Sequence, residues 1–174
     1  MKREGAVRRT AVIAPLAAAD VDAVVALAHK VWRAHYPGII TTRQIDTMLA
    51  RRYRVAAIRK DLARDGVWWD GLIEAGALSA FANYLTTGLR AEMKLDKLYV
   101  DPARQRTGLG GWLLEHVVAA ARRQGCNRLM LAVNKRNASA IAAYRKHGFA
   151  IEQAVVRNIG KGFVMDDYVM VRNV

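Results

Sequence analysis

The chain has one cysteine, Cys126, among its 174 residues. No disulfide can form within the chain, and we expect a reducing compartment, the cytoplasm. No segment approaches the roughly 18 apolar residues of a membrane-spanning helix. A short apolar stretch at residues 11–19 follows several basic residues, but Pro15 interrupts it and two aspartates come soon after, so we do not interpret it as a secretory signal. The sequence therefore predicts a cytoplasmic protein that does not engage a membrane.

Internal repeats, low-complexity tracts and linkers rich in proline, glycine or serine are also missing from the sequence. Hydrophobic residues make up 53% of the chain and charged residues 25%, which is ordinary for a globular protein. A chain of 174 residues is long enough to bury a sizeable core. We therefore expect a single domain over residues 1–174.

Acidic residues are scarce, because 15 Asp and Glu stand against 28 Lys and Arg, for a net charge of +13. This balance favours anionic partners, either a phosphorylated coenzyme or nucleic acid. The densest basic stretch lies within residues 51–64, and we interpret it as the solvated face of an amphipathic helix. Because no helix-turn-helix or base-stacking motif accompanies it, nucleic acid is the weaker alternative. The four histidines show no ligand spacing, and we expect no metal site.

The apolar residues alternate along the chain between the period of a helix and that of a strand. Pro37 and Gly38 end the first helix, and Thr41 or Thr42 caps the second, with Gln44 placed for a capping box with Thr41. The expected order β-α-α-β-β-β-α-β-α-β-β describes an α/β fold with a mixed, mostly antiparallel sheet flanked by helices. We expect strands at 7–14, 67–74, 77–85, 92–100, 128–133, 149–157 and 163–171, and helices at 21–35, 42–64, 109–123 and 137–147.

The most informative segment is residues 98–111, where an apolar strand ends at Pro102 and a glycine loop leads into a helix. The backbone N–H groups of such a loop and of a helix start attract phosphate. The spacing is Gln-x-x-Gly-x-Gly, carried by Gln105, Gly108 and Gly110. It is neither a P-loop nor a complete Gly-x-Gly-x-x-Gly fingerprint. We therefore expect a pyrophosphate site at this loop.

A second motif follows about thirty residues later, where residues 137–149 contain Asn-x-x-Ala-x-x-x-Tyr-x-x-x-Gly-Phe. The two motifs, in this order and at this separation, resemble those of the GNAT superfamily of acetyl-CoA-dependent N-acetyltransferases. Arg106 stands where that family often has glycine, so it either contacts a phosphate or restricts the turn. The resemblance implies acetyl-CoA as co-substrate, bound by Leu98, Tyr99, Val100, Gln105, Arg106, Thr107, Gly108, Leu109, Gly110, Gly111, Asn137 and Tyr144.

The strand at residues 92–100 changes phase within its length. Up to Leu95 its aliphatic residues occupy odd positions, and from Leu98 onward they occupy even positions. A strand cannot change phase without an extra residue, so we expect a β-bulge near residues 96–97, the alternative being imprecise phasing. The resemblance implies that this bulge parts the strand from its neighbour, admits the pantetheine arm and directs the Leu98 N–H at the thioester carbonyl.

The family chemistry is direct attack of an amine on the acetyl thioester in a ternary complex. Leu98 N–H is then the donor to the oxyanion, and Tyr144 is the candidate acid for the coenzyme A thiolate because its phenol is protonated at neutral pH. Glu92 is the candidate general base through a water molecule. Asp96, His35, Tyr36 and bulk water are the alternatives.

The first two helices and the last strand pair wall the acceptor site in the family. Here that implies a substrate site made by Trp32, His35, Tyr36, Phe163 and Asp166, together with Asp167 and Tyr168. We predict an N-acetyltransferase that acts on a primary amine of a small molecule or of a peptide or protein. A non-catalytic acyl-CoA sensor and a basic nucleic-acid-binding module are the alternatives. An edge strand in the last pair would support a homodimer.

Overall fold

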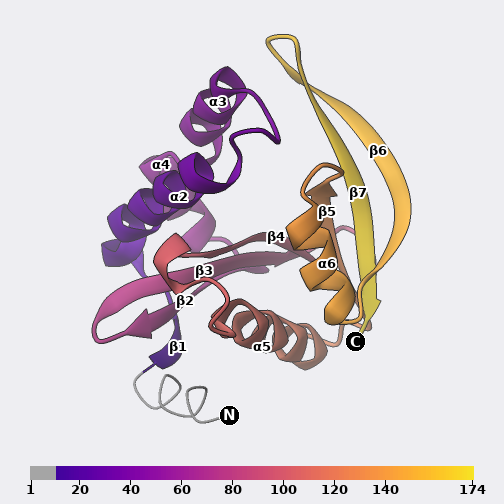
Figure 1. Cartoon of the computed structure of the whole chain (residues 1–174). Helices are drawn as coiled ribbons and strands as arrows, with labels where there is room; N and C mark the ends of the chain where they lie inside the picture. The colour runs from indigo at the N-terminus through magenta and orange to yellow at the C-terminus, as the bar shows by residue number, and fades with distance from the viewer. Residues whose placement is uncertain (1–10) are drawn as a thin grey trace.

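The computed structural model describes residues 11–174, which form one seven-stranded sheet in the order β1-β2-β3-β4-β5-β7-β6 (Figure 1). All neighbouring strands in this sheet are antiparallel except β4 and β5, which are parallel. The strands are β1 (Ala11–Pro15), β2 (Val67–Glu74), β3 (Ala77–Thr86), β4 (Glu92–Val100), β5 (Arg128–Asn134), β6 (Ala150–Gly160) and β7 (Phe163–Asn173). The helices are α2 (Val21–His35), α3 (Thr42–Arg52), α4 (Val55–Leu62), α5 (Leu109–Arg123) and α6 (Ala138–Lys146).

The expected α/β class and mostly antiparallel sheet are confirmed. The first strand differs from its expected bounds, since β1 ends at Pro15, and residues 7–10 lie outside the described part of the chain. No helix in residues 11–174 has the length and apolar character needed to cross a membrane.

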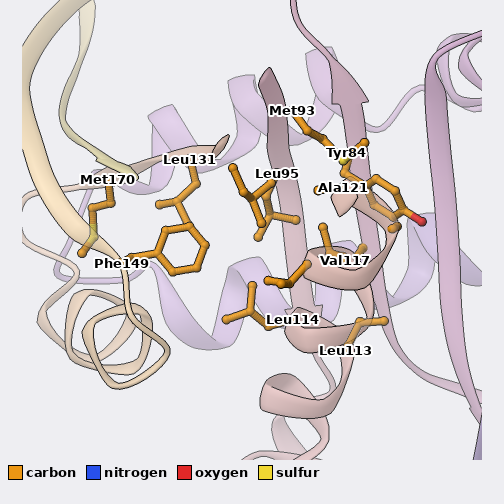
Figure 2. Close-up of a cluster of buried hydrophobic side chains, with 14 of the residues drawn as sticks. Tyr84, Met93, Leu95, Leu113, Leu114, Val117, Ala121, Leu131, Phe149 and Met170 are labelled. Atoms are coloured by element: carbon orange, nitrogen blue, oxygen red, sulfur yellow. The ribbon is translucent and has the colours of Figure 1, made fainter. Parts of the chain in front are cut away.

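Helices cover both faces of the sheet, and each face has its own hydrophobic core. On one face α5 packs through Leu113, Leu114 and Val117 against β-strand residues such as Leu95 and Leu131 (Figure 2). Each fully buried aliphatic side chain of this kind contributes about 2 kcal/mol of transfer free energy. On the other face a second core joins α2, α3 and α4 to the sheet. The two cores hold the central strands of the sheet, including β4, from both sides.

The basic helix expected at residues 42–64 is two helices, because the chain turns at Tyr53 between α3 and α4. Tyr53 is buried, and its ring forms T-shaped contacts with Trp32 and Phe81, with centroid distances of 6.1 and 6.4 Å. These contacts come from distant parts of the chain, so the pattern within residues 42–64 could not reveal the break. Packing of one aromatic residue has overridden the local helical period.

The N-terminus of α3 is partly as expected. Thr41 is the N-cap, and its Oγ1 accepts a hydrogen bond from the Gln44 N–H at 3.2 Å. The prediction of a capping box is wrong, because the Gln44 side chain donates its Nε2–H to the Val164 carbonyl at 3.0 Å. Gln44 therefore ties α3 to the start of β7, and the pairing helps to place the β6–β7 hairpin beside α3 (Figure 1).

Candidate active site

The site begins where β4 and β5 part. Their parallel ladder covers four residue pairs and ends at Leu95 and Leu131. On the other side of β4, Leu95 pairs with Tyr84 and Lys97 with Asn83, which leaves Asp96 as an extra residue. This is the β-bulge expected from the phase change, and it bends β4 away from β5 at that point.

The backbone of β4 beyond the bulge presents polar groups to this opening. The Asp101 N–H donates to the Ser79 carbonyl at 2.8 Å, which makes these two a hydrogen-bonded antiparallel pair. Hydrogen-bonded pairs alternate along such a ladder, so the N–H and C=O groups of Leu98 and Val100 point away from β3. The Val100 carbonyl does so, because it accepts a hydrogen bond from Gln105 Nε2 at 3.3 Å. The Leu98 N–H is therefore directed toward the side on which β5 has separated.

The glycine loop supplies a second set of free N–H groups. Gly108 is the N-cap of α5 and has φ +88°, a left-handed conformation that glycine adopts without strain. The first N–H of the helix bonded back to it is that of Trp112, which donates to the Gly108 carbonyl at 3.0 Å. The N–H groups of Leu109, Gly110 and Gly111 have no partner within the helix. They form the anion-binding end of α5.

Contacts outside the cavity hold this loop in shape. Arg104 donates from Nε to the Glu74 carboxylate at 2.9 Å, which fastens the loop to β2. Thr107 Oγ1 donates to the Arg104 carbonyl at 2.6 Å. Arg106 adopts φ +62°, so the backbone there is in the left-handed region that glycine adopts most readily. The loop is thus preorganised, and the Arg106 side chain faces the cavity described next.

A cavity of about 690 Å³ joins the opening between β4 and β5 to the glycine loop and to the C-terminal end of α2. Residues of the β6–β7 hairpin also line it, among them the charged residues Arg157 and Asp167. Thr107, Gly108 and Leu109 lie beside it in the loop and are not among the lining residues. The predicted site residues that line it are Trp32, His35, Tyr36, Asp96, Leu98, Tyr99, Val100, Gln105, Arg106, Gly110, Gly111, Asn137, Tyr144 and Asp167.

Tyr144 and Asn137 enter the cavity from α6. Asn137 is the N-cap, and its Oδ1 accepts the Ala140 N–H at 3.3 Å. The same oxygen lies 3.0 Å from His35 Nε2 at the end of α2. Burial, and then the neighbouring Tyr99, raise the pKa of Tyr144 above its usual value, so its phenol stays protonated at neutral pH. The geometry thus provides a proton donor and an amide side chain on the same wall.

Glu92 is not brought to this cavity. It is the first residue of β4, six positions before Leu98, which corresponds to about 20 Å along an extended strand. Its carboxylate accepts hydrogen bonds from Arg128 Nε at 2.6 Å and from Thr87 Oγ1 at 2.9 Å. Glu92 is therefore a buried structural ion-pair partner at the far end of the strand, and its assignment as general base does not fit the structure.

Asp96, an alternative base, is occupied by cations. Burial alone would raise its pKa, but Lys97, Arg52 and Lys94 outweigh that effect and hold the pKa of this carboxyl well below its usual range. Arg52 Nη2 and Lys94 Nζ each lie 2.8 Å from one of its oxygens. A carboxylate held in this way is a poor proton acceptor. Asp96 instead fixes the bulge in place.

Three predicted acceptor residues lie outside the cavity, among them Tyr168, whose ring centroid lies 5.6 Å from Lys135 Nζ. Asp166 forms an ion pair with Lys135 and faces a smaller hollow beside the loop after α2. Phe163 lies at the start of β7, where its ring is covered by Arg43 at 5.8 Å. The side chain that does reach the cavity is the neighbour, Asp167, which is only 2% exposed. The two aspartates differ because successive residues of a strand point to opposite faces, and only the register of β7 against β5 decides which one points inward.

Residues 29–149 match the sequence profile described as the acetyltransferase (GNAT) family. The chain belongs to this family. Among residues 11–174 no three His, Cys, Asp or Glu side chains are grouped so that they could hold a metal ion.

Individual GNAT relatives share parts of the chain to different extents. The chain is 40% identical over 86 residues to the [ribosomal protein bS18]-alanine N-acetyltransferase of Escherichia coli K12, a match that covers 49% of this chain and 55% of that protein. The chain thus spans about half the length of this and the other ribosomal-protein acetyltransferases that it matches. It is 23% identical over 160 residues to the spermidine N(1)-acetyltransferase of Thermoplasma acidophilum, covering 88% of this chain and 94% of that protein.

A solved structure of the PaiA N-acetyltransferase from Thermoplasma acidophilum, in complex with coenzyme A, superposes with a TM-score of 0.83 at 20% identity. The match covers 94% of this chain and 99% of that one. The similarity shows that the two chains share a fold over nearly their whole length.

Proposed function

We propose that this GNAT protein is an N-acetyltransferase that transfers an acetyl group from acetyl-CoA to a primary amine by direct attack in a ternary complex. The observation that carries the proposal is the parting of β4 and β5 beyond Leu95 and Leu131, which opens into the same cavity as the glycine loop. A pantetheine arm is an extended chain with amide groups, and a parted pair of strands offers it backbone partners. The loop N–H groups lie at one end of this opening, where the pyrophosphate would sit.

The residues divide the chemistry between them. The N–H groups of residues 109–111 bind the pyrophosphate, and the backbone of Val100 pairs with pantetheine. The Leu98 N–H donates to the carbonyl oxygen as it becomes negative, an effect worth about 3 kcal/mol for a preorganised donor. Tyr144 then donates a proton to the departing thiolate of coenzyme A. Cys126 lies in the core beneath α5 and is not a cavity residue, which supports direct attack without an acyl-cysteine.

The charges of the cavity favour a peptide amine over a polyamine. Away from the glycine loop, five basic residues and two acidic residues line it. A polycation would meet this excess of positive charge, whereas a peptide N-terminus brings one charge and backbone amides. The relatives named above include both kinds of enzyme, one named for an alanine of a ribosomal protein and one for spermidine. The basic residues are Arg51, Arg52, Lys94, Lys97 and Arg157, and the acidic residues are Asp96 and Asp167.

The test has two stages, binding and turnover. Calorimetric titration with coenzyme A should give saturable heat, and thiol release from acetyl-CoA should depend on an added amine, with an alanine-initiated peptide a better acceptor than spermidine. Binding without amine-dependent thiol release would instead indicate an acyl-CoA sensor. The absence of any coenzyme binding would refute the proposal.

Two further expectations stay predictions. We place the protein in the cytoplasm, because acetyl-CoA is available there and the single cysteine excludes an intramolecular disulfide. We also expect that β6, which is an edge strand of the sheet, can support a homodimer.

A further inference from the structure

Asp167 is a buried carboxylate in the cavity whose hydrogen bonding is incomplete. Its side chain is 3% exposed, and its Oδ2 accepts one long hydrogen bond, from Arg157 Nη2 at 3.3 Å. Its Oδ1 is shielded from solvent and has no hydrogen-bond partner in the part of the chain that the structure describes. A buried acceptor without a donor is unfavourable, so a donor that enters the cavity is favoured at this carboxylate.

The sheet register places Asp167 close to the proposed reaction centre. Asp167 pairs across the sheet with Asn134, which lies three residues beyond the last residue of β5 paired with β4. Leu98 likewise lies three residues beyond the end of that pairing on β4, with the bulge between. Leu98 and Asp167 are therefore at nearly the same height on the two sides of the opening, and both line the cavity.

We propose that Asp167 is the general base of the acetyl transfer, taking a proton from the acceptor ammonium directly or through one water molecule. This inference rests on the proposed N-acetyltransferase function and adds the group that Glu92 and Asp96 do not provide. The ammonium nitrogen gives one proton to an Asp167 carboxylate oxygen, and rotation about the Cβ–Cγ bond lets either oxygen face the cavity. The neutral nitrogen then forms a bond to the acetyl carbon while the carbonyl oxygen becomes an oxyanion beside Leu98 N–H.

The remaining protons and electrons balance as follows. The carbon–sulfur bond breaks, its electron pair goes to sulfur, and Tyr144 protonates the thiolate. The second nitrogen proton is lost to solvent, from which Tyr144 recovers its own, and the third stays in the amide. Asp167 releases its proton to solvent, so one proton is produced for each ammonium acetylated.

The surroundings of Asp167 suit this role. Burial, with a smaller contribution from Asp166, raises the pKa of Asp167 above its usual value, although Arg157 and Arg52 oppose the rise. Arg157 comes from β6 and Arg52 from α3, so cations face the carboxyl from two elements. A carboxyl with a raised pKa accepts a proton more readily near neutral pH than an exposed one. Asp96, by contrast, is fully occupied by cations.

The test compares Asp167→Asn with Asp166→Asn, the adjacent aspartate that does not line this cavity. With acetyl-CoA and an alanine-initiated peptide as the probe, Asp167→Asn should lower kcat/KM about 100-fold at pH 7, with unchanged affinity for coenzyme A. The difference in kcat/KM between Asp167→Asn and the parent should become smaller above about pH 8, where a peptide amine is already neutral. Asp167→Glu should recover part of the rate, and Asp166→Asn should match the parent protein.

The base assignment would be overturned if Asp167→Asn, with coenzyme binding intact, kept kcat/KM within about twofold of the parent across the pH range. The acetyltransferase proposal would still stand. Loss of coenzyme binding by the parent protein would overturn both. If the peptide is not acetylated, carboxyl carbon-13 NMR of the coenzyme complex decides the question without an acceptor. The Asp167 carboxyl should then titrate above about pH 3.9, and a midpoint at or below that value would contradict the proposal.

Discussion

The Nε2 atom of His35 lies 3.0 Å from the Oδ1 atom of Asn137, which joins the C-terminal end of α2 to the N-cap of α6. An amide oxygen only accepts hydrogen bonds, so His35 donates from Nε2. The contact links the two walls of the cavity, one on the acceptor side and one on the coenzyme side. Tyr144 lies two turns further along α6, so its position depends on α2 as well as on α6.

Removing this link should cost stability. We expect Asn137→Ala to lower the free energy of unfolding by about 1 to 2 kcal/mol, because it removes the N-cap and the contact with His35. Asn137→Ser keeps a capping oxygen on a shorter side chain and should recover most of the capping part. A double-mutant cycle with His35→Ala, followed by urea denaturation, should give a coupling of about 0.5 to 1 kcal/mol. Strict additivity of the two substitutions would argue that the contact contributes nothing.

Tyr144→Phe should separate catalysis from binding. The substitution removes the phenolic proton while keeping the ring, whose edge contact with Phe149 has a centroid distance of 5.7 Å. We expect kcat to fall about 100-fold, since the thiolate must then leave without a proton donor, while the affinity for coenzyme A changes less than about twofold. Steady-state thiol release together with calorimetry measures both quantities. An undiminished kcat would remove Tyr144 from the role of acid.

Gly108→Val should weaken coenzyme binding through the loop. The new side chain would stand at the N-terminus of α5 beside the free N–H groups, and φ +88° would strain the backbone. Loss of a single charge-assisted hydrogen bond corresponds to about 10- to 100-fold in affinity. Gly76→Val is the matched control, because Gly76 has φ +80° and equally open surroundings but lies in the turn between β2 and β3. Both variants should lose similar stability, and equal coenzyme affinities would show that the loop has been misassigned.

The ion pair at the far end of β4 should matter for stability and not for turnover. Arg128→Met leaves the Glu92 carboxylate buried without its cation, and we expect a loss of about 2 kcal/mol in the free energy of unfolding. Adding Glu92→Gln should recover part of that loss, since the buried charge is then gone. Glu92→Gln alone should keep kcat within about twofold of the parent in the thiol-release assay. A large drop in kcat with normal stability would restore Glu92 as a candidate base.

Much of the fold could be predicted from the sequence, because the spacing of the hydrophobic residues and the positions of the glycines mark the helices and strands clearly. The structure has β2, β4 and α5 at the residues expected, and the bulge lies at Asp96 as the change of phase predicted. The break between α3 and α4 could not be predicted, because it depends on the packing of Tyr53 against residues far away in the sequence.

The acceptor side was harder to predict than the coenzyme side. The coenzyme loop is a local motif, so its residues lie together in the sequence and in space. Glu92 was wrongly expected in the site, because the sequence does not show which end of the nine-residue strand β4 lies at the cavity. The sequence offered both Asp166 and Asp167, and it could not distinguish them because the inward face of β7 is set by its pairing with β5, which brings Asp167 opposite Asn134.

The four residue pairs between β4 and β5 are a short seam between two halves of the sheet, one made of β1 to β4 and the other of β5, β7 and β6. Beyond these four pairs β4 and β5 form no further backbone pairing, so a molecule bound across the gap would act as an added strand. We therefore expect a ligand in the gap to hold the two halves of the sheet more rigidly together. Amide hydrogen exchange along β5 past Leu131 should slow when the gap is filled, and it would report occupancy even where no reaction takes place.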